Sequence, residues 1–120
     1  MGLFSRKKKE YVGEYSKEAD DQYMDGVGLC GHGKFDEAVT LFDKILEFEP
    51  NHTEVLILKG HALGQLGKFD EAVIAYDKTI DVDPDYGDAW YNKSKALKYL
   101  DRNEEAKKCF DKAEELGYNA

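Results

Sequence analysis

The sequence predicts an all-α fold, an α-α superhelix of three antiparallel helix-turn-helix units. The strongest observation is a repeat: the seven residues GKFDEAV stand at residues 33–39 and again at 67–73, 34 positions later. A weaker third copy keeps only the acidic pair and the alanine, as NEEA at residues 103–106. Three units of 34 residues (19–52, 53–86 and 87–120) then account for the chain from Ala19 to its last residue. Repeats of this length predict stacked supersecondary units, each too small to bury its apolar face alone.

Each unit is expected to contain two helices, because its apolar residues recur at helical spacing. Gly33 and Gly67 stand between the two halves of their units, and glycine ends a helix at little cost because it accepts a positive φ. In the second unit the periodic residues are Leu56, Gly60 and Leu63 in the first half, and Phe69, Ala72, Val73, Tyr76 and Ile80 in the second half.

The connections between units contain prolines, at Pro50 and Pro84. After them, Asn51 with Glu54 and Asp85 with Asp88 have the spacing of a helix N-cap and an acidic third residue. We therefore expect Asn51 and Asp85 to cap the first helices of the second and third units.

The first helix of the first unit contains several glycines, and each interior glycine costs a helix about 1 kcal/mol relative to alanine. This helix also has a polar outer side, with Asp21, Gly28 and His32 where the later units have apolar residues. We expect it to be the least protected helix, with residues 24–31 opening before residues 56–63.

The charge distribution argues against nucleic acid as a partner. The formal net charge is −8, but four of the 17 basic residues lie at residues 6–9 and all 25 acidic residues follow them. Residues 10–120 therefore carry a formal charge of −12, with 13 basic against 25 acidic residues. A body this acidic repels phosphate backbones.

Residues 1–18 are predicted to form a flexible basic arm. Leu3 and Phe4 beside four cations give a weak indication of membrane contact through residues 1–9, and a solvated tail is the simpler interpretation. No apolar run approaches the roughly 20 residues that span a bilayer. Cys30 and Cys109 have no shared local spacing, so two free thiols of a cytoplasmic protein are expected.

Motifs that resemble chemical sites do not support catalysis. GVGLCG at residues 26–31 has the spacing of a dinucleotide-binding loop but follows an acidic helical segment instead of a strand. DVDPD at residues 81–85 starts like a calcium loop, yet Tyr86 stands where glycine is required. The histidines and cysteines lack the paired spacing of a zinc site. We expect no enzyme, no cofactor and no metal.

The repeat resembles the tetratricopeptide repeat (TPR), a 34-residue helix-turn-helix unit, over residues 19–120. Departures from its pattern are Gln22, Asp101 in place of a turn glycine, and Tyr118 in place of a third proline. The residues that carry the resemblance are Trp90; Gly26, Gly60 and Ser94; Leu29, Leu63 and Leu97; Ala38, Ala72 and Ala106; Phe42, Tyr76 and Phe110; and Pro50 and Pro84.

The resemblance implies a concave groove, lined by the first helix of each unit, that binds an extended peptide or a partner's helix. Tyr23, Ile57 and Tyr91 are the expected anchors, because apolar groups on one exposed surface suggest a contact. The acids in this set equally suit the helix dipole. By register the groove residues are Asp20, Tyr23, Val27, Cys30, Glu54, Ile57, His61, Gly64, Asp88, Tyr91, Lys95 and Lys98.

Some members of this family hold an acidic chaperone tail through a clamp of lysine, asparagine and arginine. In this chain the corresponding positions are Tyr23, Val27, Leu58 and Asp88, with only Asn92 suitable in type. We therefore expect a protein or peptide partner that is apolar and basic, and an adaptor or scaffold function. The alternative is a structural subunit that self-associates through its terminal helix faces, including an apolar strip around Cys109, Phe110 and Leu116.

Overall fold

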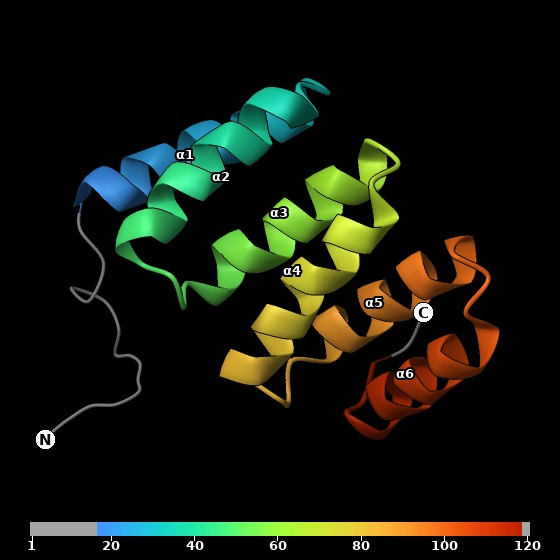
Figure 1. The fold of residues 1–120 in the computed structure, drawn as a ribbon. Helices are drawn as coiled ribbons and strands as arrows, with labels where there is room; N and C mark the ends of the chain where they lie inside the picture. The colour runs from blue at the N-terminus through green and yellow to red at the C-terminus, as the bar shows by residue number, and fades with distance from the viewer. Residues whose placement is uncertain (1–16, 119–120) are drawn as a thin grey trace, which may run out of the picture.

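The computed structural model describes residues 17–118, which contain six α-helices and no strand (Figure 1). The all-α prediction and the division of each unit into two helices are confirmed. Lys17 and Glu18, expected in the basic arm, already belong to the first helix, and the rest of the arm lies outside the described residues. The helices are α1 (Lys17–Gly31), α2 (Phe35–Phe48), α3 (Thr53–Gln65), α4 (Phe69–Val82), α5 (Gly87–Tyr99) and α6 (Asn103–Glu115).

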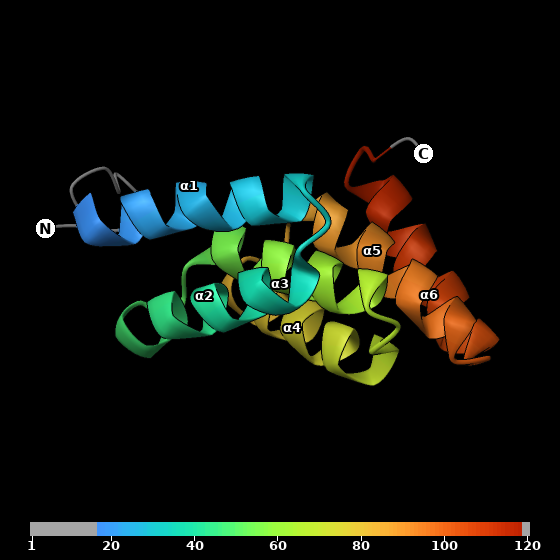
Figure 2. The same cartoon turned by 90° about the horizontal axis from the view of Figure 1, so that it is seen from above.

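The three hairpins lie side by side in chain order, and each helix packs against the next one in the sequence. The first helices α1, α3 and α5 also contact one another in succession. From above, the first helix of each hairpin lies on one side of the molecule and the second helix on the other (Figure 2). The surface formed by α1, α3 and α5 is therefore continuous across all three units.

Within each of the first two units, an aromatic ring of the second helix lies on a glycine of the first. Phe42 is fully buried against Gly26, and Tyr76 is buried against Gly60. A side chain on either glycine would occupy the space of the ring. Close approach of the two helices therefore explains the small residue at this position.

The two glycine turns have the conformation expected from the sequence. Gly33 and Gly67 adopt φ values of +75° and +78°, and the amide after each bonds back across the turn, as from Lys34 to the Leu29 carbonyl at 2.8 Å. In the third unit Asp101 takes the same place with φ +60°. A non-glycine residue there is strained, although Asp tolerates this region better than most.

The predicted N-caps Asn51 and Asp85 are wrong. The helices start one residue later than expected: His52 caps α3, with its Nδ1 accepting a hydrogen bond from the Val55 amide at 3.4 Å. Tyr86 precedes α5 and makes no side-chain cap. Asp85 instead donates its amide to Asp83 Oδ1 at 3.1 Å, because the turn after the proline contains one more residue than expected.

Ion pairs join consecutive units at repeat spacing. Lys59 on α3 lies 2.6 Å from Asp43 on α2, and Lys93 on α5 lies 2.6 Å from Asp77 on α4. The second pair lies 34 residues after the first, so the same contact forms at both junctions between units. Each pair joins a first helix to the second helix of the preceding unit.

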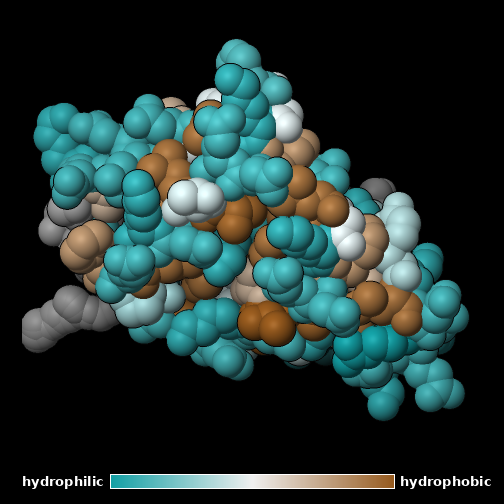
Figure 3. Space-filling model, turned by 45° about the horizontal axis from the view of Figure 1, so that its top comes forward, coloured by the Kyte–Doolittle hydropathy of each residue, from teal (hydrophilic) through white to brown (hydrophobic). Residues whose placement is uncertain are grey.

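The apolar strip expected around Cys109, Phe110 and Leu116 is not exposed. Cys109 is only 5% exposed, and Phe110 and Leu116 are half-buried. The most exposed large hydrophobic residues instead lie on different helices: Phe48, Tyr99, Ile74 and Met24. The face drawn in Figure 3 accordingly shows separate hydrophobic patches among hydrophilic side chains. Among the described helices, none is long and apolar enough to cross a membrane.

Candidate protein-interaction groove

All the residues expected to line the groove lie on α1, α3 and α5. Seven of them are exposed: Asp20, Val27, Glu54, His61, Asp88, Lys95 and Lys98. The other five are half-buried: Tyr23, Cys30, Ile57, Gly64 and Tyr91. These positions therefore combine accessible polar side chains and one accessible apolar residue, Val27, with partly covered residues that are mostly apolar.

The three acids of this set lie at the same end of their helices. Asp20, Glu54 and Asp88 occupy the first turns of α1, α3 and α5. Burial raises the pKa of Tyr86, and the charges of Glu54 and Asp88 raise it further. The first turns of α1, α3 and α5 thus form one acidic end of the surface made by these three helices.

Tyr23 and His52 belong to the same acidic end. Their rings stack at 5.8 Å between centroids. Burial raises the pKa of Tyr23, and the charge of Glu54 adds to this effect. Burial lowers the pKa of His52, while Glu54 and Asp20 act in the opposite direction. The ring of Tyr23 therefore has one face occupied inside the protein.

Tyr91 and Ile57 are likewise held by neighbours. Tyr91 stacks on Tyr118 at 4.3 Å, approaches Phe110 at 6.2 Å, and has Lys95 Nζ 5.4 Å from its ring centroid. Ile57 packs against the core cluster that contains Leu63 and Tyr76. Tyr23, Ile57 and Tyr91 are therefore half-buried, because each of them also packs within the stack of helices.

A first pocket of about 210 Å³ lies between the second and third units. Of the predicted residues it contains His61, Gly64 and Lys95; sequence reasoning missed Gln65, Phe69, Asn92 and Tyr99 as lining residues. Phe69 and Tyr99 stack with their centroids 4.5 Å apart. The recurrence of phenylalanine at residues 35 and 69 could have indicated Phe69 as a lining residue, but the helical spacing of Phe69 suggested a core position only.

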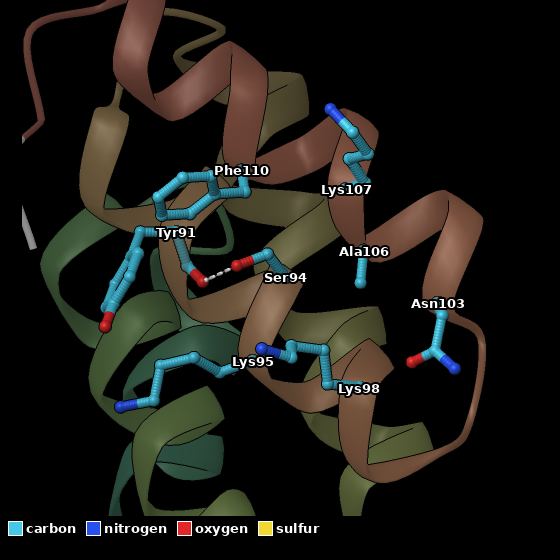
Figure 4. Close-up of a pocket in the computed structure, with 8 residues that line it drawn as sticks. All are labelled: Tyr91, Ser94, Lys95, Lys98, Asn103, Ala106, Lys107 and Phe110. Carbon is cyan, nitrogen blue, oxygen red and sulfur yellow. Dashed lines mark hydrogen bonds between the residues drawn. The ribbon is translucent and has the colours of Figure 1, made fainter.

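A second pocket of about 500 Å³ lies on α5 and α6 (Figure 4). The rings of Tyr91 and Phe110 lie at one end of it and Asn103 at the other. Ser94 is buried in its floor and donates a 2.6 Å hydrogen bond to the Tyr91 carbonyl. Sequence reasoning found Tyr91, Lys95 and Lys98 but missed the lining residues Ser94, Asn103, Ala106, Lys107 and Phe110.

The described residues offer little for metal or thiol chemistry. Within residues 17–118 no three His, Cys, Asp or Glu side chains are grouped so that they could hold a metal ion. Cys30 and Cys109 are free thiols, and burial raises the pKa of both. A raised pKa reduces the thiolate fraction, which is the reactive form.

The stacked hairpins and their shared face define the class: a helical-repeat, protein-interaction module. Models of the tetratricopeptide repeat match residues 29–80 and 87–116. The chain belongs to the tetratricopeptide repeat family. No curated protein matches the chain significantly.

Solved structures support the same assignment. The first TPR of Spaghetti (RPAP3), bound to the HSP90 peptide SRMEEVD, superposes with a TM-score of 0.83 at 26% identity, covering 88% of this chain and 83% of that one. A structure of MamA from AMB-1 gives a TM-score of 0.79 at 30% identity, covering 84% and 60%. The second TPR of Spaghetti, at 21% identity and a TM-score of 0.80, shows the fold alone. In the comparison with MamA from AMB-1, the chain spans less than two thirds of the matched chain's length.

Proposed function

We propose that this protein is a non-catalytic adaptor or scaffold of the cytoplasm whose groove on α1, α3 and α5 holds an extended peptide or helix of a partner. The observation that carries the proposal is that Tyr23, Ile57 and Tyr91 stand at the same position of their units and are each half-buried. Part-covered apolar side chains lose little entropy on binding and suit the role of anchors. The likeness to a peptide-bound TPR domain supports a peptide as ligand.

The ligand is proposed to be apolar or aromatic with basic residues, unlike an acidic chaperone tail. Asp20, Glu54 and Asp88 gather at one end of the groove, where they would repel incoming carboxylates. The clamp positions that the family resemblance implies hold Tyr23 and Asp88, where a carboxylate needs cations or amides. Lys95 and Lys98 offset this only in the third unit.

A backbone-amide NMR titration with two peptides tests the proposal. The first peptide, LFSRK, copies residues 3–7 and is apolar and basic; the second is the acidic SRMEEVD. We expect saturable shifts at Tyr23, Ile57 and Tyr91 from the first peptide. We expect its affinity to fall roughly threefold to tenfold in the double variant Asp20→Asn, Glu54→Gln, since exposed charge pairs are each worth about 0.2–1 kcal/mol.

The matched control is Asp25→Asn, which removes an exposed acid from α1 at a position outside the groove register. This variant should bind LFSRK like the parent protein. Saturable shifts at the three anchors from SRMEEVD alone would contradict the charge argument. Shifts from neither peptide, nor from longer versions with the same pattern, would count against a peptide groove at this face.

A further inference from the structure

The second pocket, on α5 and α6, corresponds by the 34-residue repeat to a surface on which the next helix packs in the earlier units. We call such a surface a seat. Residues 34 positions earlier line the first pocket, where α5 of the next unit packs: His61, Gly64, Phe69, Ala72 and Tyr76 correspond to Lys95, Lys98, Asn103, Ala106 and Phe110. Both earlier seats of the chain hold a helix, α3 on the first unit and α5 on the second. The shape of the third seat is therefore also that of a helix.

The charge of the third seat differs from that of the others. Lys95, Lys98 and Lys107 line it, and no acidic side chain does. At the same register the second unit has His61, Gly64 and Val73. Lys98 is exposed and has no ion-pair partner among residues 17–118, whereas Lys107 lies 3.1 Å from Asp111. In a body with a strong excess of acids, this is a local cationic surface.

We propose that this seat docks an acidic amphipathic helix of a partner protein, at a site that shares Tyr91, Lys95 and Lys98 with the end of the groove and extends from there onto α6. The apolar stripe of such a helix would cover the half-buried rings of Phe110 and Tyr91 and would lie over Ala106, which is already only 2% exposed. Its acidic residues would meet Lys98 and Lys107, which lie on the two helices that form the seat. Because the lysines are exposed, their main contribution is to selectivity and association rate.

A second copy of this chain fits the seat poorly. If α1 of another molecule continued the superhelix, Asp21 would take the place that Val55 and Ala89 hold in the existing stack, and both of these are 0% exposed. A carboxylate buried among apolar groups is costly. Asp25 would take the place of Lys93, which pairs with Asp77, and would face Asp111 instead. Two unfavourable charges therefore disfavour head-to-tail stacking.

The chain itself supplies a probe for the seat. A peptide of residues 85–100 reproduces α5, whose face already fits the seat of the second unit. The acidic probe carries Asn92→Glu and Lys95→Glu, two positions of α5 that line the first pocket, and keeps Lys93 to meet Asp111. The basic probe carries Asn92→Lys and keeps Lys95. We expect the acidic probe to bind about fivefold more tightly, with amide shifts at Ala106 and Phe110.

Variants of the protein reverse the preference. In the double variant Lys98→Glu, Lys107→Glu the basic probe should bind more tightly than the acidic one. Lys78→Glu, an exposed change on α4, is the control and should leave the order unchanged. Circular dichroism confirms that each variant is folded.

The remaining outcomes would overturn the proposal. Equal binding of the two probes, a preference for the basic probe, or shifts confined to Tyr23 and Ile57 would remove the seat as an acidic-helix site. Ala96→Pro in the acidic probe prevents it from forming a helix. If this probe bound as tightly as the helical one, the ligand of the seat would be an extended segment and not a helix. Dimerisation of the protein in sedimentation equilibrium that Lys98→Glu abolishes would assign the seat to a second copy.

Discussion

Gly60 lies so close to the ring of Tyr76 that a Cβ atom on residue 60 would be 2.5 Å from Tyr76 Cε1. The ring is only 4% exposed, and burial raises the pKa of Tyr76 to about 12. Gly60→Ala should therefore destabilise the protein by about 1–3 kcal/mol, because the ring must shift in a packed core and this outweighs the helix propensity of alanine. The midpoint of urea unfolding measures the change.

Gly64→Ala in the same helix is the control for this prediction. A Cβ at residue 64 meets nothing within 4 Å, so the substitution should be neutral or stabilising by up to about 1 kcal/mol. If both variants shifted the midpoint in the same direction, glycine flexibility and not close packing would explain residue 60.

Asp101 is the one described non-glycine residue with positive φ, at +60°, in the turn where the other units have glycine. Asp101→Gly should stabilise the protein by about 0.5–1 kcal/mol, since glycine adopts this conformation without steric strain and the gain outweighs its larger entropy loss. Thermal unfolding measures the change. Gly67→Asp is the reverse experiment: it should lower stability, and a gain there would contradict the strain argument.

Both of these predictions concern positions that the repeat already singles out: Gly60 as a small residue and Asp101 as the departure from the turn glycine. The 34-residue period predicted six helices and their pairing, because one alanine position and the helical spacing recur in every unit and the glycines recur in the first two. The caps were not predictable, since a cap preference is worth only about 1 kcal/mol and the turn after each proline placed His52 and Tyr86, not Asn51 and Asp85, at the helix starts.

For the candidate site, the repeat could predict which helices hold its residues but not what covers them. The periodicity placed Tyr23 and Tyr91 on the first helices of their units, and these are α1 and α5 in the structure. It could not show that His52 and Tyr118 cover them, because those partners come from a connection between units and from the end of the chain. The pair of Lys93 and Asp77 was visible as two residues repeated at the same interval, but only the helix crossing brings them together.

The burial of His52 predicts that the protein loses stability in mild acid. This histidine is 3% exposed, and burial lowers its pKa below the ordinary value of 6.5. Above that value the ring is neutral in both the folded and unfolded states, so nothing is lost. As the pH falls below 6.5 the unfolded chain binds a proton that the folded protein resists, and the free energy of unfolding decreases until the lower folded pKa is reached.

Urea unfolding at pH 7.5 and 5.5 measures this effect in the parent protein and in His52→Asn. Asparagine also serves as an N-cap, so the variant should remain folded. We expect a smaller difference between the two pH values in the variant. An unchanged difference would mean that other groups, and not His52, cause the acid sensitivity. His32→Asn, at an exposed histidine, is the control and should behave like the parent.

Helix α1 is predicted to open before α3 in amide hydrogen exchange. Only Ala19 and Gly26 are buried in α1, whereas five residues are buried in α3, so α1 has less packing to lose when it opens. Gly28 adds to this, because a Cβ there meets nothing within 4 Å and the residue only weakens the helix. Amides of residues 24–31 should exchange faster than those of residues 56–63. Gly28→Ala should slow exchange in α1, whereas Gly26→Ala should speed it by displacing Phe42. Equal protection of the two segments in the parent protein would show that the acidic, exposed outer side of α1 does not weaken it.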